Sequence, residues 1–196
     1  MTEPQYDAEA ALVVIDVQND FASPQGSLFV AGADAVVEEV NRQIALAQAA
    51  GGHVLYTQDW HPEQTPHFLP QGGVWPVHCV GGSWGAEFHP ALTVSGEVVR
   101  KGADTEDGYS GFTVRDHESG DKSATLLEGL LREHGVQRVM VVGLATDYCV
   151  QATALDAIDR GFETSVLLAA VAGVEATPGD TERAHDTMRA AGVTLL

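Results

Sequence analysis

Short runs of apolar residues, rich in β-branched side chains, recur along the chain and alternate with stretches in which apolar residues follow helical spacing. Residues 10–15 (AALVVI) and 138–143 (RVMVVG) are almost continuously apolar, which is typical of central strands buried on both faces of a parallel sheet. The other expected strands are residues 54–58, 97–101, 164–168 and 193–196, and the expected helices are residues 34–50, 124–133, 147–160 and 181–191.

Strands that alternate with helices imply right-handed crossovers and a parallel sheet covered by helices on both sides. We expect an α/β fold of Rossmann type, a three-layer α-β-α arrangement with a six-stranded parallel sheet. A length of 196 residues suits one domain over residues 1–196. Two stretches lack a regular pattern, and we expect functional loops or lids at about residues 60–95 and 102–121.

The charge balance narrows the possible partners. The formal net charge is −18 with only ten Lys and Arg, so we expect no association with nucleic acid or with an anionic membrane surface. A small-molecule substrate is the better expectation.

The polar start, residues 1–7, lacks the features of a signal peptide, and no apolar stretch approaches the roughly 20 residues that span a bilayer. We therefore expect a cytoplasmic protein, of an oligomeric state that the sequence does not reveal.

Four residues that bind metals in other proteins lie close together in the sequence. Asp59, His61 and His67 follow the expected strand at residues 54–58, and His78 comes shortly after them. Imidazole and carboxylate ligands suit zinc, iron or manganese, whereas calcium and magnesium prefer shells made only of oxygen. The cluster therefore predicts one divalent transition metal ion.

Reactive side chains also follow the ends of other expected strands. Asp16 follows the first strand, Lys101 ends the third and Cys149 comes just after the fourth, and ligands bind at this edge of open α/β sheets. With Thr146 or Asp147 as the N-cap, Cys149 would lie in the first turn of a helix, where the helix dipole and Lys101 would lower the pKa of its thiol. Asp16 could carry a proton between the thiol and a leaving group. This set predicts acyl transfer through a thioester.

Two other interpretations stay open at this point. The metal could activate a water molecule as the nucleophile, which would make Cys149 incidental. The chain could also be a metal-binding or redox-sensing module without turnover.

We interpret Cys79 as a small buried apolar residue, leave His89 undecided, and expect ordinary packing for the remaining histidines, which are His53, His117, His134 and His185.

Several segments of the chain resemble the isochorismatase-like cysteine hydrolases, and most closely the nicotinamidases, also called pyrazinamidases. The matching segments follow the family's order and cover nearly the whole chain: residues 16–21 (DVQNDF), 59–61 (DWH) with His67, 75–79 (WPVHC), 101–102 with 109–112 (YSGF), and 143–150 (GLATDYCV). The set of one Asp and three His narrows the resemblance, because the isochorismatase-type and carbamoyl-type members lack it.

The resemblance implies roles for particular residues. It implies a catalytic triad of Asp16, Lys101 and Cys149, and metal ligation by Asp59, His61, His67 and His78. It also implies a cis peptide bond between Leu144 and Ala145, which turns the amides of Ala145 and Cys149 towards the substrate oxygen as an oxyanion hole. The expected pocket walls are Phe21, Leu28, Trp75, Tyr109 and Tyr148. Some relatives carry His at the position of Tyr148.

The function implied by this resemblance is the hydrolysis of nicotinamide to nicotinate and ammonia, with pyrazinamide as a further substrate. In that case the metal would bind the pyridine nitrogen and hold the amide over the sulfur of Cys149. The alternative within the family is an amidase that acts on a different heteroaromatic or small carboxamide.

Overall fold

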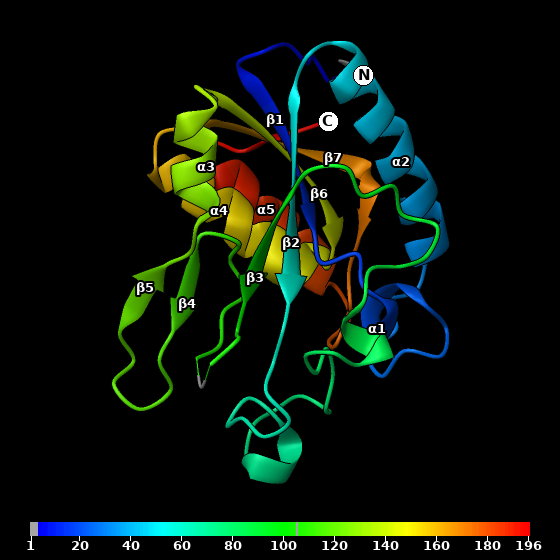
Figure 1. Ribbon diagram of the computed structural model, residues 1–196, viewed down its shortest axis with the longest axis vertical. Coiled ribbons are helices and arrows are strands. Elements are labelled where there is room, and N and C mark those ends of the chain that lie inside the picture. Colours follow the sequence, from blue (N-terminus) through cyan, green and yellow to red (C-terminus); the bar gives the residue numbers. More distant parts are fainter. Residues whose placement is uncertain (1–3, 105) are drawn as a thin grey trace.

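The computed structural model describes residues 4–104 and 106–196. Its central sheet has six parallel strands in the order β3-β2-β1-β6-β7-β8 (Figure 1). The strands are β1 (Ala10–Ile15), β2 (His53–Asp59), β3 (Glu97–Lys101), β6 (Arg138–Leu144), β7 (Glu163–Ala172) and β8 (Thr194–Leu195). The six-stranded parallel sheet that the apolar runs predicted is confirmed.

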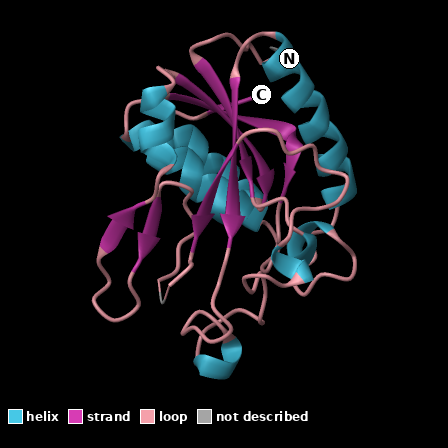
Figure 2. Cartoon of the chain, in the orientation of Figure 1, coloured by secondary structure: helices cyan, strands magenta, loops and turns pink. Residues whose placement is uncertain are grey.

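Helices cover both faces of this sheet (Figures 1 and 2). Helix α2 (Ala33–Ala49) packs on one face, and α3 (Leu127–Glu133), α4 (Gln151–Asp159) and α5 (Asp180–Ala190) pack on the other. Each face has its own hydrophobic core. The three-layer α-β-α arrangement is therefore confirmed as well.

Strand β1 shows why its sequence is apolar throughout. All six of its residues are buried, and from Ala11 to Ile15 they alternate between the two cores. Leu12 and Val14 pack in the core that contains α2, whereas Val13 and Ile15 pack in the core that contains α3, α4 and α5. Since neither face of the strand meets water, each position favours an apolar side chain, and burial of one stabilises the fold by about 1.5–3 kcal/mol.

The second predicted loop region is more regular than expected. Strand β4 (Thr113–Arg115) pairs antiparallel with β5 (Lys122–Ala124), and together they form a separate two-stranded sheet. The irregular structure predicted up to residue 121 was therefore wrong over β4. The helix predicted from residue 124 begins at Leu127 because Ala124 belongs to β5. Both strands are short and of mixed polarity, so no hydrophobic period marks them.

Two further differences affect the site. Strand β7 ends at Ala172 rather than at residue 168, and after an irregularity between Val141 and Gly143 it pairs with the end of β6. A short helix that the sequence pattern did not indicate, α1 (Asn19–Ala22), follows β1. Both differences place additional residues at the carboxyl edge of the sheet.

The long loop after β2 is attached to the sheet by buried polar contacts. Residues 60–95 contain two short 3₁₀ turns, η1 (Leu69–Gln71) and η2 (Trp84–Ala86). The side-chain amide of Gln18 donates to the carbonyl oxygens of Asp59 at 2.7 Å and Ala86 at 2.9 Å, and its oxygen accepts the Asp59 amide at 2.8 Å. One side chain thus joins the end of β2 to the far part of the loop.

Across residues 4–104 and 106–196, none of the helices has the length and apolarity needed to cross a bilayer. Residues 1–3, which belong to the polar start that underlies the cytoplasmic prediction, lie outside the described residues. So does Thr105 in the second loop.

Two Gly→Ala substitutions should change stability in opposite directions. Gly143 has a φ of 108°, and a Cβ atom there would lie 2.2 Å from the carbonyl oxygen of Ile15. We expect Gly143→Ala to destabilise the protein by about 2–5 kcal/mol, through backbone strain and overpacking. Gly129 lies within α3 with nothing within 4 Å of the added Cβ, so Gly129→Ala should stabilise by about 0.5–1 kcal/mol. Urea unfolding measures both changes, and equal midpoints for the two variants would contradict the prediction.

Candidate active site

The structure brings four of the predicted site residues together at the carboxyl edge of the sheet. Asp16 directly follows β1, Asp59 and Lys101 end β2 and β3, and Cys149 lies beyond the end of β6. Asp59 and Lys101 are direct partners in the register of β2 and β3. Strands β1 and β6 are neighbours in the sheet, and the strand order reverses between them, which is where open α/β sheets bind their ligands.

Lys101 connects these residues. Its side chain is fully buried, and its ammonium lies 2.9 Å from Oδ2 of Asp16 and 3.7 Å from Sγ of Cys149. It also forms an ion pair with Oδ1 of Asp59 and donates to the carbonyl oxygen of Gly108 at 3.3 Å. The other oxygen of Asp16, Oδ1, accepts a 2.7 Å hydrogen bond from the Thr57 hydroxyl. The carboxylates of Asp16 and Asp59 and the thiol of Cys149 lie within 4.8 Å of one another.

The electrostatics favour a charged lysine beside a neutral thiol. Burial by itself lowers the pKa of Lys101, but the carboxylates of Asp16 and Asp59 outweigh it and raise that pKa well above its usual range. Burial raises the pKa of Asp16, and Lys101 opposes this rise. Burial also raises the pKa of Cys149 well above its usual range, although Lys101 acts to lower it. The expected lowering of the thiol pKa was therefore wrong, because the sulfur is less exposed to water than a helix terminus suggests.

The turn that carries Cys149 also differs from the prediction. A single π-helical turn, η3 (Thr146–Val150), precedes α4, and the residue that flanks it is Ala145, in an extended conformation. Asp147 does not cap the helix. Its carboxylate accepts the backbone amides of Val174 at 2.9 Å and Glu175 at 2.8 Å, which ties the segment after β7 to this turn. The peptide bond between Leu144 and Ala145 is cis, as the family resemblance implied.

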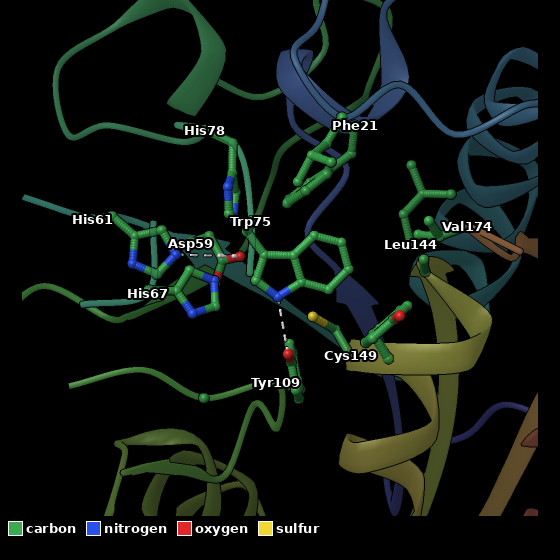
Figure 3. A pocket seen from close by; sticks show the side chains of 14 residues that line it. Phe21, Asp59, His61, His67, Trp75, His78, Tyr109, Leu144, Cys149 and Val174 are labelled. Atoms are coloured by element: carbon green, nitrogen blue, oxygen red, sulfur yellow. Dashed lines mark hydrogen bonds and ion pairs between the residues drawn. The ribbon is translucent and has the colours of Figure 1, made fainter. Parts of the chain in front are cut away.

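Three histidines form a buried group next to Asp59. Ring nitrogens of His61, His67 and His78 lie within 4.8 Å of one another, and Nε2 of His61 lies 3.8 Å from Oδ2 of Asp59. Figure 3 shows this group on one side of the Trp75 indole, with Cys149 on the other. The structure thus brings together all four residues of the predicted metal cluster, although they come from a strand end and three separate parts of a loop.

A buried carboxylate holds the loop that carries His78. Oδ2 of Asp20 accepts the backbone amide of Cys79 at 2.7 Å, and its Oδ1 accepts the amide of Ser27 at 3.0 Å. The backbone amide of His61 donates to the Cys79 carbonyl at 2.9 Å. Cys79 is buried and its thiol faces the carbonyl of Gly85 at 3.9 Å, which agrees with its interpretation as a packed apolar residue.

One pocket contains both the thiol and the histidines (Figure 3). The residues predicted as its walls all line it, namely Phe21, Leu28, Trp75, Tyr109 and Tyr148, and Ala145 does too. Trp75 donates from Nε1 to the Tyr109 hydroxyl at 3.0 Å, and the rings of Trp75 and Tyr148 meet edge to face with centroids 4.9 Å apart. Aromatic rings thus border an otherwise apolar space between the sulfur and the three imidazoles.

Some residues at the site were not found from the sequence. Thr57 hydrogen-bonds to Asp16 from within β2, and nothing in the pattern distinguishes it from an ordinary strand residue. Val174 lines the pocket because β7 extends to Ala172, and a longer predicted strand would have indicated it. Oδ2 of Asp107 lies 3.1 Å from Nδ1 of His67 and 3.3 Å from Nε2 of His117. His117 was expected to be an ordinary packing residue.

Comparison with known proteins gives a consistent result. The family model described as Isochorismatase domain matches residues 10–196. A nicotinamidase/pyrazinamidase of Mycobacterium tuberculosis is 43% identical over 191 residues, which cover 95% of this chain and 97% of the relative. The pyrazinamidase of Pyrococcus horikoshii, solved in complex with zinc, is 40% identical with a TM-score of 0.84, covering 96% of this chain and 98% of that one. PnC1 from L. infantum, solved in complex with nicotinate, is 36% identical with a TM-score of 0.88, covering 98% and 95%. The chain belongs to the isochorismatase family.

Proposed function

We propose that this protein is an amidohydrolase that converts nicotinamide to nicotinate and ammonia, with pyrazinamide as a second substrate. The observation that carries the proposal is the shared pocket, in which the Cys149 thiol and the group of His61, His67 and His78 line the same space. Relatives named nicotinamidase support it, among them the Escherichia coli enzyme at 38% identity over 94% of this chain.

In the proposed first step, Cys149 attacks the carboxamide carbon. Its thiol is neutral at rest, so a base must take the proton as the carbon–sulfur bond forms, and Asp16 is the base within reach. The raised pKa of Asp16 makes its carboxylate a better proton acceptor than an ordinary one. The backbone amide of Ala145 donates no hydrogen bond to another described residue, so it is available, with the amide of Cys149, to stabilise the tetrahedral oxyanion.

Breakdown of the intermediate releases ammonia and leaves an acyl thioester on Cys149. Asp16 returns its proton to the departing nitrogen. It then removes a proton from the water that attacks the thioester, and passes it to the sulfur as the carbon–sulfur bond breaks and nicotinate leaves. Lys101 stays protonated throughout because Asp16 and Asp59 raise its pKa. Its ammonium stabilises the developing thiolate and, through the 2.9 Å ion pair, orients Asp16.

The histidine group fits a divalent transition metal ion. Both ring nitrogens of His61 are buried, and neither forms a hydrogen bond within the described part of the chain. Leaving a buried nitrogen without a partner costs free energy unless a ligand satisfies it. Burial lowers the pKa of His61 to about 4, so the imidazole is neutral near pH 7, as metal binding requires. We propose Asp59, His61, His67 and His78 as the ligands of Zn, Fe or Mn. When bound, such an ion supplies a Lewis acid for a ring nitrogen of the substrate.

The pocket walls favour a flat aromatic amide. Phe21, Trp75, Tyr109 and Tyr148 surround the space with ring edges and faces, and stacked or edge-to-face contacts with another ring add about 0.5–1.5 kcal/mol each beyond simple burial. We propose that this frame, with Leu28 as its apolar side, selects pyridine and pyrazine carboxamides. A small-molecule substrate and a cytoplasmic location also remain part of the proposal.

The first test concerns the nucleophile. Cys149→Ala should lower turnover of nicotinamide by at least about a thousandfold, because no other described thiol lines the pocket. Quenching the wild-type protein during turnover and mapping its peptides by mass spectrometry should give an acyl adduct on the peptide with Cys149. The peptide with Cys79 is an internal control and should carry none. Full activity of Cys149→Ala would instead favour a metal-activated water as the nucleophile.

The second test separates the metal from the thiol. Treatment with a chelator should lower kcat/KM for nicotinamide, since the ring nitrogen loses its partner, and added Zn²⁺, Mn²⁺ or Fe²⁺ should restore it. Labelling of Cys149 by iodoacetamide should persist in the stripped protein, because Asp16 and Lys101 do not depend on the ion for their contacts. Unchanged turnover in protein shown to be free of metal would rule out the proposed role of the histidines.

The third test uses the pH dependence of stability in metal-free protein. The unfolded chain protonates His61 near pH 6.5, whereas the folded protein does so only near pH 4. Between these values the unfolded state binds more protons, so the free energy of unfolding should fall as the pH falls, by up to about 3 kcal/mol from this residue. Urea unfolding at several pH values should show a smaller fall for His61→Gln. An identical pH dependence in both proteins would show that His61 is not protected from protonation.

A further inference from the structure

Asp107 lies between two histidines from separate parts of the chain. Its Oδ2 is 3.1 Å from Nδ1 of His67, which belongs to the long loop after β2. The same oxygen is 3.3 Å from Nε2 of His117, which belongs to the turn between β4 and β5. An ionised carboxylate can only accept a hydrogen bond, so in this contact Nδ1 of His67 carries the proton.

This hydrogen bond leaves Nε2 of His67 free to bind a metal ion together with the other histidines. With Nδ1 donating to Asp107, Nε2 is the nitrogen with a free lone pair for a metal. His78 is arranged in a similar way, because its Nδ1 lies 2.7 Å from the backbone carbonyl of Pro76. Histidines that bind metals in proteins usually donate their second nitrogen to a carboxylate or a carbonyl, which fixes the ring orientation.

We propose that Asp107 is a positioning residue for the metal centre, which holds His67 in the tautomer and orientation that bind the ion. The inference rests on the proposed metal role of the histidines and adds a residue to it. It also gives the β4–β5 hairpin a role, because His117 contacts the same carboxylate from the turn of that hairpin.

A second cation held by His67, Asp107 and His117 is the competing explanation, since their ligand atoms also lie within 4.8 Å of one another. It requires His67 to give up the Nδ1 proton and to bind two ions at once as an imidazolate. A single hydrogen bond at 3.1 Å needs no such deprotonation. The positioning role is therefore the simpler consequence of the geometry, and counting the bound ions distinguishes the two.

The backbone around Asp107 does not depend on its side chain. The amide of Asp107 donates to the Arg115 carbonyl at 2.9 Å, and the two residues form an antiparallel bridge next to β4. Asp107→Asn keeps the size of the side chain and this bridge, and removes only the charge and the strong acceptor. Glu106→Gln is the matched control, because it removes one charge from the adjacent position, where the carboxyl makes no ion pair with the described residues.

The test is the affinity for Zn²⁺ alone, measured by competition with a chromophoric chelator, together with the number of ions bound per chain. Asp107→Asn should bind Zn²⁺ about 10–100-fold more weakly than wild type, while Glu106→Gln stays within about twofold of it. All three proteins should bind one ion and unfold at the same urea concentration without metal. Saturating Zn²⁺ should restore kcat in Asp107→Asn, which damage to the fold would not allow.

Three results would overturn the proposal: an unchanged affinity in Asp107→Asn, an equal loss in Glu106→Gln, or two bound ions in wild type that become one in Asp107→Asn. The measurement is independent of the proposed reaction. If the wild type binds Zn²⁺ but does not hydrolyse nicotinamide, the proposed function fails while the affinities still decide the role of Asp107.

Discussion

The buried ammonium of Lys101 is the interaction on which the rest of the site depends. Two carboxylates, Asp16 and Asp59, reach the same water-excluded space from neighbouring strands, and without a cation between them their repulsion and desolvation would favour loss of a charge or an opening of the sheet edge. Lys101 contacts both, and also the sulfur of Cys149. The parallel register that places Lys101 beside Asp59 is therefore an electrostatic requirement as well as a feature of the backbone.

Lys101 is also linked to the histidine group, through Asp59. Oδ1 of Asp59 faces the ammonium, while its Oδ2 faces His61, so one carboxylate belongs both to the charged cluster around the thiol and to the histidine group. The long loop completes the arrangement from the other side, held by Gln18 and Asp20 through buried hydrogen bonds to its backbone. The pocket is thus formed between a rigid sheet edge and a loop that hydrogen bonds fix in place.

The burial of the Cys149 thiol bears on the proposed mechanism. Burial raises the pKa of Cys149, which favours the protonated form of the thiol, the form less prone to oxidation. The pKa of Asp16, the proposed base, is raised as well. In the proposed mechanism the thiolate forms only as the bond to the substrate forms, with Lys101 beside it to stabilise the charge. The site therefore does not need the standing thiolate that a helix terminus in water would favour.

The sequence by itself determined the parallel α/β sheet and the positions of Asp16, Lys101 and Cys149. Apolar runs identify strands buried on both faces, and parallel strands end at one edge, so residues that follow them must meet. The spacing of Asp59, His61, His67 and His78 likewise identified a group of metal-binding type, while the family resemblance implied the roles that are proposed for them. Only the tertiary structure decided that Thr57, Val174, Asp107 and His117 join the site, that Asp147 ties down the segment after β7, and that burial raises the pKa of the thiol. These features depend on the paths of loops and on exclusion of water, and neither leaves a period or a spacing in the sequence.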